Sequence, residues 1–250
     1  MTARRTFGLL AGLGLLLVLP VAAQDVQMDP DTVNFRLSME GEQFTAAVKI
    51  FLLLTMLSVA PAMVLMMTSF TRIVIVFSFL KQAMGSRQAP SNKTVSALAL
   101  FLTIFIMQPV WTEIYDQAVV PYADEELSED EAIERGIKPL KGFMLRQTRE
   151  STLLLFMELS DMEPVEAVED LPMRVVVPAF MLSELKTAFQ MAFLIYLPFL
   201  LIDAVVATTL MSMGMFMLPP MMVSMPVKLL LFVMFNGWEL LVRTLVTSFY

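Results

Sequence analysis

The sequence predicts an all-α membrane protein: two long helical hairpins separated by a small, acidic, mostly helical domain. Hydrophobic residues make up 57% of the 250 residues, and mean hydropathy is +0.71, whereas soluble domains contain about 45–50% apolar residues. Uncharged stretches cover residues 50–71, 94–112 and 204–227, and about 20 apolar residues suffice for one membrane span. The acidic residues concentrate between these stretches, which indicates one water-exposed region.

Residues 1–23 have the pattern of a secretory signal peptide. Arg4 and Arg5 precede a short apolar run at 7–19, and small residues follow up to Ala23, after which we expect cleavage. The alternative is a retained membrane anchor, for which the apolar run is short. Residues 24–43 form a polar N-terminal segment.

The first apolar hairpin is predicted over residues 44–112. Pro61 lies inside the first uncharged stretch, so we expect a bend or break near it. Residues 82–93 contain glycine, proline and asparagine and predict the turn before the second span.

Charge patterning predicts the orientation of this hairpin. Residues 43–112 contain no acidic side chain, but they contain the basic residues Lys49, Arg72, Lys81, Arg87 and Lys93. Short basic loops face the cytoplasm, so the turn should lie inside and the chain from Glu113 onward should lie in the periplasm.

Residues 113–174 form the predicted acidic periplasmic domain. Ser128 and Glu131 have the spacing of a capping box, which starts a helix that Gly136 can end. Pro139 suits the first turn of a further helix reaching about residue 160, in which Arg146 and Glu150 would pair. A region of this size buries only a small hydrophobic core, so we do not expect it to be stable on its own.

The second apolar hairpin is predicted over residues 175–250, with a helix that Pro178 can start. A methionine-rich loop lies within it at residues 211–225, which we call the methionine loop. Its seven methionines surround Gly214 and the pair Pro219–Pro220 without any charge, and these residues predict a helix break. The loop methionines on either side of the central 215–217 segment are Met211, Met213, Met221, Met222 and Met225.

The methionine loop has two interpretations. Methionine fills irregular gaps in ordinary cores, and the chain has 23 methionines in all. Broken backbone at membrane depth is tolerated only where it is buried in protein or lines a cavity. The density of methionine at a predicted break therefore favours a deformable apolar gasket.

Four ionisable residues lie in or beside the apolar stretches: Arg72, Glu184, Asp203 and Lys228. A charge at a helix centre costs about 2.5–3.5 kcal/mol on insertion scales, so each should find a partner. We expect structural pairing, with Asp203 and Lys228, which flank the methionine loop, as the first pair to test. The alternative is an ion path.

Composition argues against an enzyme. The chain lacks cysteine and histidine, which removes the commonest general base and the commonest metal ligands. No phosphate-binding glycine loop or zinc-protease motif occurs, so we expect no catalytic residue, cofactor or metal. Basic residues do not cluster on a face, so no nucleic acid is expected as a partner.

Several segments resemble the FliP family, subunits of the flagellar type III export gate. The resemblance covers about residues 45–250, in family order. It rests on LTMLSVAP at 54–61, MMTSFTRI at 66–73, FMLRQTRE at 143–150, PAFMLSELKTAFQ at 178–190, PVK at 226–228 and GWEL at 237–240.

This resemblance implies a subunit of the bacterial inner membrane and flagellar basal body, with a large periplasm-facing portion. Several copies would surround a channel together with FliQ-like and FliR-like chains and other export-apparatus proteins, in contact with lipid, and unfolded flagellar subunits would pass through. The family's helices are raised toward the periplasm rather than simply spanning lipid. The rival reading is a single-subunit ion- or proton-coupled transporter that uses Asp203 and Glu184.

The resemblance also implies site residues. The family's gasket corresponds to Met215, Phe216 and Met217, where the central phenylalanine replaces a usual methionine. Ala192 and Asn236 replace a usual glycine and aspartate. The residues that match family charges, expected as buried or intersubunit groups, include Arg146, Arg149 and Lys186.

Overall fold

The computed structural model describes residues 41–85, 90–162 and 167–250, with side chains from residue 48 onward. The predicted signal peptide, its cleavage site at Ala23 and nearly all of the polar segment 24–43 lie outside the described residues. The helices are α2 (Gly41–Met66), α3 (Phe70–Ala83), α4 (Asn92–Ile114), η2 (Tyr115–Val119), α5 (Val120–Ala123), α6 (Glu129–Gln147), α7 (Glu150–Leu159), η3 (Val168–Asp170), α8 (Met173–Ser212), α9 (Pro220–Met234) and α10 (Gly237–Thr247).

The all-α class predicted from composition is confirmed, since the described residues contain no strand. Three helical stretches are long and apolar enough to cross a membrane: Val48–Met66, Asn92–Ala123 and Met173–Ser212. Helices α9 and α10, which meet at 65°, would add a fourth span if they act as one broken span. The 40 residues of α8 extend for about 60 Å, twice the hydrocarbon thickness of about 30 Å, so only part of this helix fits inside a bilayer.

Residues 55–250 form one compact unit, and the described part of the other unit is the beginning of α2. Helix α2 exposes its apolar side chains from Val48 to Val64. Apolar surface on this scale marks contact with lipid or with another protein.

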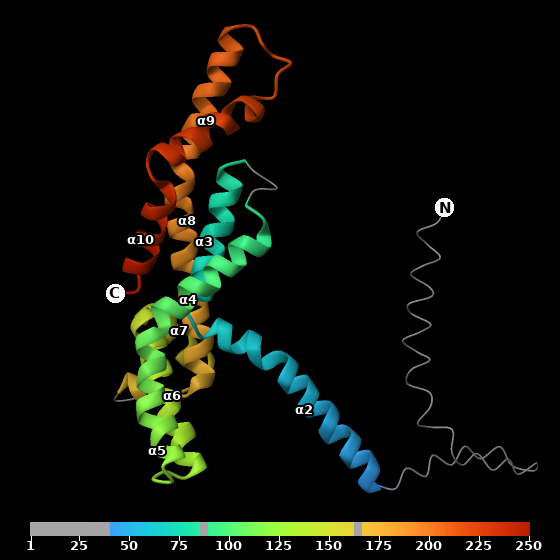
Figure 1. Cartoon of the computed structure of the whole chain (residues 1–250), viewed down its shortest axis with the longest axis vertical. Helices are drawn as coiled ribbons and strands as arrows, with labels where there is room; N and C mark the ends of the chain where they lie inside the picture. Colours follow the sequence, from blue (N-terminus) through green and yellow to red (C-terminus); the bar gives the residue numbers. More distant parts are fainter. Residues whose placement is uncertain (1–40, 86–89, 163–166) are drawn as a thin grey trace, which may run out of the picture. The chain divides into compact units, whose positions relative to one another are not determined.

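Helix α8 is the centre of the compact unit. It packs most extensively against α3 and also contacts α6, α7 and α9, and Figure 1 shows α3 running alongside it. The buried side of α8 includes small residues at Ala179, Ser183, Ala188 and Ala192. Small side chains allow close helix approach, so this face suits intimate packing.

The acidic region shares this core. Helix α6 packs against α4, η2 and α8, and α7 packs against α8. Phe143 and Met144 of α6 belong to the same buried cluster as Ile73 of α3 and Phe180 of α8. The region that we expected to have a small core of its own therefore draws its stability from the apolar helices.

Several sequence-based helix limits are wrong. Helix α2 continues through Pro61, and the break comes later, between Met66 and Phe70. Helix α6 begins at the predicted capping box but continues through Gly136 and Pro139 to Gln147. Helix α8 begins at Met173, before Pro178. A proline inside a helix costs about 3 kcal/mol, and at Pro139 and Pro178 the buried residues nearby offset that cost through tertiary packing.

The predicted pairing of Arg146 with Glu150 is also wrong. Thr148 and Arg149 are extended, with ψ of 134° and 137°, and they separate α6 from α7. Residues four apart are neighbours only within one continuous helix, so this break removes the pairing.

Candidate functional site

The four charges in the apolar stretches form two ion pairs. Arg72 on α3 pairs with Glu184 on α8, and both side chains are buried. Lys228 on α9 pairs with Asp203 on α8 through a contact of 2.6 Å between Nζ and Oδ2. The structure therefore brings these residues together as the structural-pairing hypothesis expects.

Arg72 is the centre of a larger cluster, which we call the arginine junction: Arg72, Glu184, Gln147, Ser248 and Phe249. Its Nε donates to Glu184 Oε2 at 2.9 Å, and Nη2 donates to Glu184 Oε1 and, at 3.0 Å, to Gln147 Oε1. Its Nη1 donates to the carbonyl oxygen and to Oγ of Ser248, both at 2.9 Å. The guanidinium carbon lies 3.8 Å from the centre of the Phe249 ring.

This geometry replaces all of the hydrogen bonds that the Arg72 guanidinium loses when it is removed from water. A guanidinium has five N–H groups, and each has an acceptor in the junction. A buried ion pair is stable only when good geometry and added hydrogen bonds repay desolvation, and the ring face adds a cation–π contact. The junction thereby links α3, α6, α8 and the segment after α10.

The second pair belongs to a cluster that we call the lysine brace: Lys228, Asp203, Ser224 and the carbonyl group of Ala83. Lys228 Nζ donates to Ala83 O at 3.0 Å, and Ser224 Oγ donates to Asp203 Oδ1 at 2.6 Å. The Lys228 side chain is 4% exposed, and that of Asp203 is 40% exposed. The brace joins the two legs of the α8–α9 hairpin at the base of the methionine loop and fastens them to the end of α3.

The predicted break in the methionine loop is confirmed and has specific capping geometry. Gly214 has φ of 75°, its N–H donates to Met211 O, and the N–H of Met215 donates to Leu210 O, both at 3.0 Å. These two bonds form a Schellman motif, which ends a helix at a left-handed glycine. Pro220 then opens α9 at its first position, where the missing N–H costs nothing.

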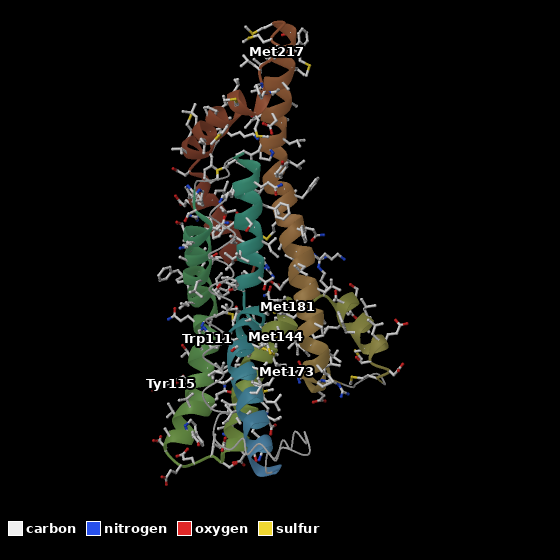
Figure 2. All side chains as sticks on the ribbon, turned by 90° about the vertical axis from the view of Figure 1, so that its right-hand side faces the viewer. Trp111, Tyr115, Met144, Met173, Met181 and Met217 are labelled. Atoms are coloured by element: carbon white, nitrogen blue, oxygen red, sulfur yellow. The ribbon has the colours of Figure 1, made fainter. Side chains whose placement is uncertain are left out.

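The methionine loop presents its apolar side chains outward. Met217 is 96% exposed, Phe216 77% and Met215 39%. Figure 2 shows Met217 at the end of the hairpin formed by α8 and α9, far from Met144 and Met173. Met211, Met213, Met221 and Met222 are exposed as well, and Met225 is half-buried. These side chains have little contact with the rest of the chain, so they do not fill gaps in its core.

The other predicted charges lie on the surface of the α6–α8 region. Arg149 donates through its backbone N–H to Ser183 Oγ at 3.0 Å and through its guanidinium to Gln190 Oε1. Arg146 and Lys186 are exposed. Their expected role at subunit contacts stays a prediction.

Sequence reasoning missed the neutral partners of these charges. Gln147, Ser248 and Phe249 close the arginine junction, and Ser224 completes the lysine brace. A serine or glutamine carries no charge that demands a partner, so its pattern in the sequence gives no signal. No group of three or more acidic side chains that could hold a metal ion occurs among the described residues.

The FliP family matches residues 53–245 of this chain. The chain is 48% identical over 238 residues to the flagellar biosynthetic protein FliP of Pectobacterium carotovorum subsp. carotovorum, covering 95% of this chain and 91% of the relative. It is 49% identical over 217 residues to the protein of the same name from Bacillus subtilis (strain 168), covering 87% and 98%. The Aquifex aeolicus (strain VF5) protein of that name is 48% identical over 205 residues, covering 81% and 86%.

These relatives span most of the chain, and the matched region includes both ion pairs and the methionine loop. The apolar helices and the flagellar relatives together identify a membrane-embedded component of flagellum biogenesis. The chain belongs to the FliP family.

Proposed function

We propose that this chain is a core subunit of the flagellar type III protein export gate. Several copies surround a channel together with FliQ-like and FliR-like subunits, and unfolded flagellar proteins pass through it. The observation that carries the proposal is the methionine loop, whose apolar side chains project from the end of a braced hairpin. An exposed apolar cluster of this kind requires a covering partner or a shared apolar surface.

The loop suits a gasket on physical grounds. An export channel must pass a polypeptide without leaking ions, and a hydrophobic constriction excludes ions by dewetting. Methionine side chains are unbranched and polarizable, so they can re-pack around a passing chain of any sequence. Met215, Phe216 and Met217 of each copy would form the ring, because they lie farthest along the loop from the helical legs.

The lysine brace supports this role. A gasket needs soft side chains on legs that keep their spacing when a substrate passes. Lys228 contacts both Asp203 on α8 and the Ala83 carbonyl on α3, so the legs below the loop are fixed to each other and to the core. Deformation would then be confined to the loop.

Location and partners follow from the same proposal. The chain would enter the bacterial inner membrane through its N-terminal signal and present a large portion, including residues 113–174, to the periplasm. Its partners would be further copies of itself, FliQ-like and FliR-like chains, other export-apparatus proteins and lipid. Arg146, Arg149 and Lys186 would lie at contacts between subunits.

The test is ion conductance of the purified complex in planar bilayers. Replacing Met215, Phe216 and Met217 together by alanine should raise resting conductance at least several-fold, because the constriction widens and wets. A matched variant with leucine at the same three positions keeps apolar bulk and should stay closed. Conductance of the alanine variant equal to that of the unchanged complex would contradict the gasket.

Particle mass separates this proposal from the transporter reading. The export gate requires a large hetero-oligomer in mild detergent when the FliQ-like and FliR-like chains are co-expressed. An ion-coupled transporter that works as one subunit would have the mass of a single chain. Native mass measurement of the co-expressed material distinguishes the two outcomes.

A further inference from the structure

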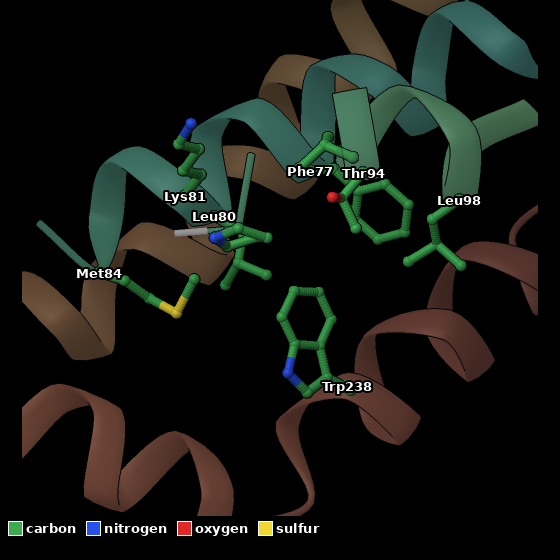
Figure 3. A pocket seen from close by; sticks show the side chains of 9 residues that line it. Phe77, Leu80, Lys81, Met84, Thr94, Leu98 and Trp238 are labelled. Carbon is green, nitrogen blue, oxygen red and sulfur yellow. The ribbon is translucent and has the colours of Figure 1, made fainter. Parts of the chain in front are cut away.

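Methionines in the core of the chain are enclosed by other side chains. Met84, Met107 and Met144 are at most 2% exposed. Figure 3 shows Met84 beside Leu80 at a small apolar cavity that Trp238 also lines. Protein interiors are close-packed, so an oxygen atom added to such a sulfur would displace its neighbours. These core methionines are therefore sheltered from reagents in water and poorly suited to modification.

The methionine loop places its sulfur atoms in the opposite environment. All of its methionines except Met225 are between 39% and 96% exposed, and Figure 2 shows Met217 at the end of the hairpin. A side-chain carbon built at Gly214 would meet no atom within 4 Å. There is thus open space at the turn of the loop, and atoms added to its exposed side chains would not strain the fold.

The surface of the loop is uniformly apolar. Residues 213–223 contain no polar side chain. The hydroxyl groups on either side are already bonded, because Ser212 Oγ donates to the Thr209 carbonyl oxygen at 2.8 Å and Ser224 Oγ donates to Asp203. A new polar group on the loop would therefore be its first side-chain group that binds water strongly.

Methionine supplies the only sulfur in this chain, which has no cysteine. A peroxide oxidises a thioether by oxygen transfer: the sulfur lone pair attacks one peroxide oxygen, an S–O bond forms and the O–O bond breaks. The other oxygen leaves as hydroxide and takes the proton from the oxygen now on sulfur, which gives water. Sulfur loses two electrons and the peroxide gains them. The product, methionine sulfoxide, is polar and can be reduced again by enzymes.

We propose that the methionine loop is an oxidation site for peroxides, and that sulfoxides at Met215 and Met217 open the closed export gate to ions. This inference rests on the proposed function, since it takes these side chains to form the gasket. A hydrophobic constriction excludes ions only while it stays dry, and each copy in the ring would add two sulfoxide oxygens that bind water. Phe216 has no sulfur and stays apolar, so it limits the leak.

The test uses the purified export complex, treated with dilute hydrogen peroxide and then examined by peptide mass spectrometry and in planar bilayers. The loop methionines should gain oxygen several-fold faster than Met107 and Met144, and resting conductance should rise several-fold. Methionine sulfoxide reductases for both sulfoxide epimers should then restore the closed state. This reversal distinguishes oxidation of methionine from irreversible damage to the complex.

Three variants locate the effect. Met215→Leu with Met217→Leu keeps apolar bulk but removes both sulfurs, so its conductance should not respond to peroxide. Phe216→Met supplies a third sulfur in each copy, so its oxidised complex should conduct more than the oxidised complex of the unchanged chain. Met56→Leu with Met63→Leu removes two exposed methionines from α2 and should leave the response to peroxide as it was.

The outcomes separate this inference from the export-gate proposal. Loop methionines that oxidise no faster than Met107 and Met144 overturn the oxidation site. If the alanine variant of the gasket leaks but oxidation of Met215 and Met217 does not cause a leak, this inference alone is overturned. If neither leaks, the gasket is overturned with it. A rise in conductance that persists when both sulfurs are replaced by leucine arises elsewhere and also overturns the inference, whereas a reversible rise that this double variant loses supports it.

Discussion

At the scale of single residues, Gly237 controls the junction between α9 and α10. A side-chain carbon built there would lie 2.3 Å from Cδ2 and Cε2 of Phe232, well inside contact distance. The Phe232 ring in turn stacks edge-on against Trp238, with ring centres 5.2 Å apart. Asn236 precedes the glycine with φ of 49°, a conformation that asparagine tolerates better than most residues. Glycine is therefore required here for close approach.

Replacing Gly237 with alanine should destabilise the protein, because the new methyl group displaces the Phe232 ring. Overpacking of this kind costs about 1–3 kcal/mol, measured as the change in free energy of unfolding in mild detergent. Gly142→Ala is the control: its nearest atom would be Arg146 Nη1 at 3.5 Å, and alanine in a helix should gain about 0.5–1 kcal/mol. Equal effects of the two substitutions would contradict the steric explanation.

At the scale of elements, α6 begins through the capping box that its sequence predicts. Ser128 Oγ accepts from the Glu131 N–H at 3.4 Å, and the Ser128 N–H donates to Glu131 Oε2 at 3.0 Å. The Ser128 backbone N–H and the Ser128 hydroxyl both donate to the Glu131 carboxylate. These hydrogen bonds, the backbone one most strongly, lower the pKa of Glu131 below its usual value. The ionised carboxylate thus stabilises the first turn of α6.

This pKa shift predicts a pH dependence with a definite sign. A lowered pKa in the folded state means that the stabilisation is present above the unfolded pKa, about 4.3, and is lost as pH falls through the folded value. Hydrogen exchange in the first turn of α6 should therefore speed up on acidification. Glu131→Gln keeps an acceptor without the titration, so its exchange should lack this dependence once intrinsic rates are corrected. A variant with the same pH response as the unchanged chain would contradict the assignment.

At the scale of the whole molecule, the arginine junction connects segments that lie far apart in the sequence. Arg72 reaches Gln147, Glu184 and Ser248, so one side chain holds α3 to α6, to α8 and to the residues after α10. The lysine brace repeats this arrangement nearer the methionine loop. Together the two clusters fix α8 against α3 at two points along its length.

Arg72→Met should cost about 3–5 kcal/mol in free energy of unfolding, because it leaves Glu184 buried without a counter-charge. Hydrogen-exchange protection should fall together in α3, α6, α8 and the segment after α10. The double variant Arg72→Met with Glu184→Met removes both charges and should be more stable than the single variant. Protection that falls in α3 alone would show that the junction does not couple these segments.

Part of this architecture is readable from the sequence. Long uncharged stretches gave the all-α membrane class, since backbone groups in lipid must bond within helices. Ser128 and Glu131 predicted the beginning of α6, and Gly214 with Pro220 predicted the break in the methionine loop, because these residues act through local backbone geometry. The pairing of Asp203 with Lys228 was predicted because a charge in an apolar segment requires a partner.

Other features depend on contacts across the fold. Prolines 139 and 178 predicted helix starts, yet packing keeps α6 and α8 continuous through them. No local pattern marked Gln147, Ser248 or Ser224 as partners of buried charges. The helical class, the local breaks and the need to neutralise each charge thus follow from the amino-acid sequence alone, because they depend on short-range chemistry. Which distant groups meet follows only from the folded chain, because it depends on how α3, α6, α8 and α9 pack.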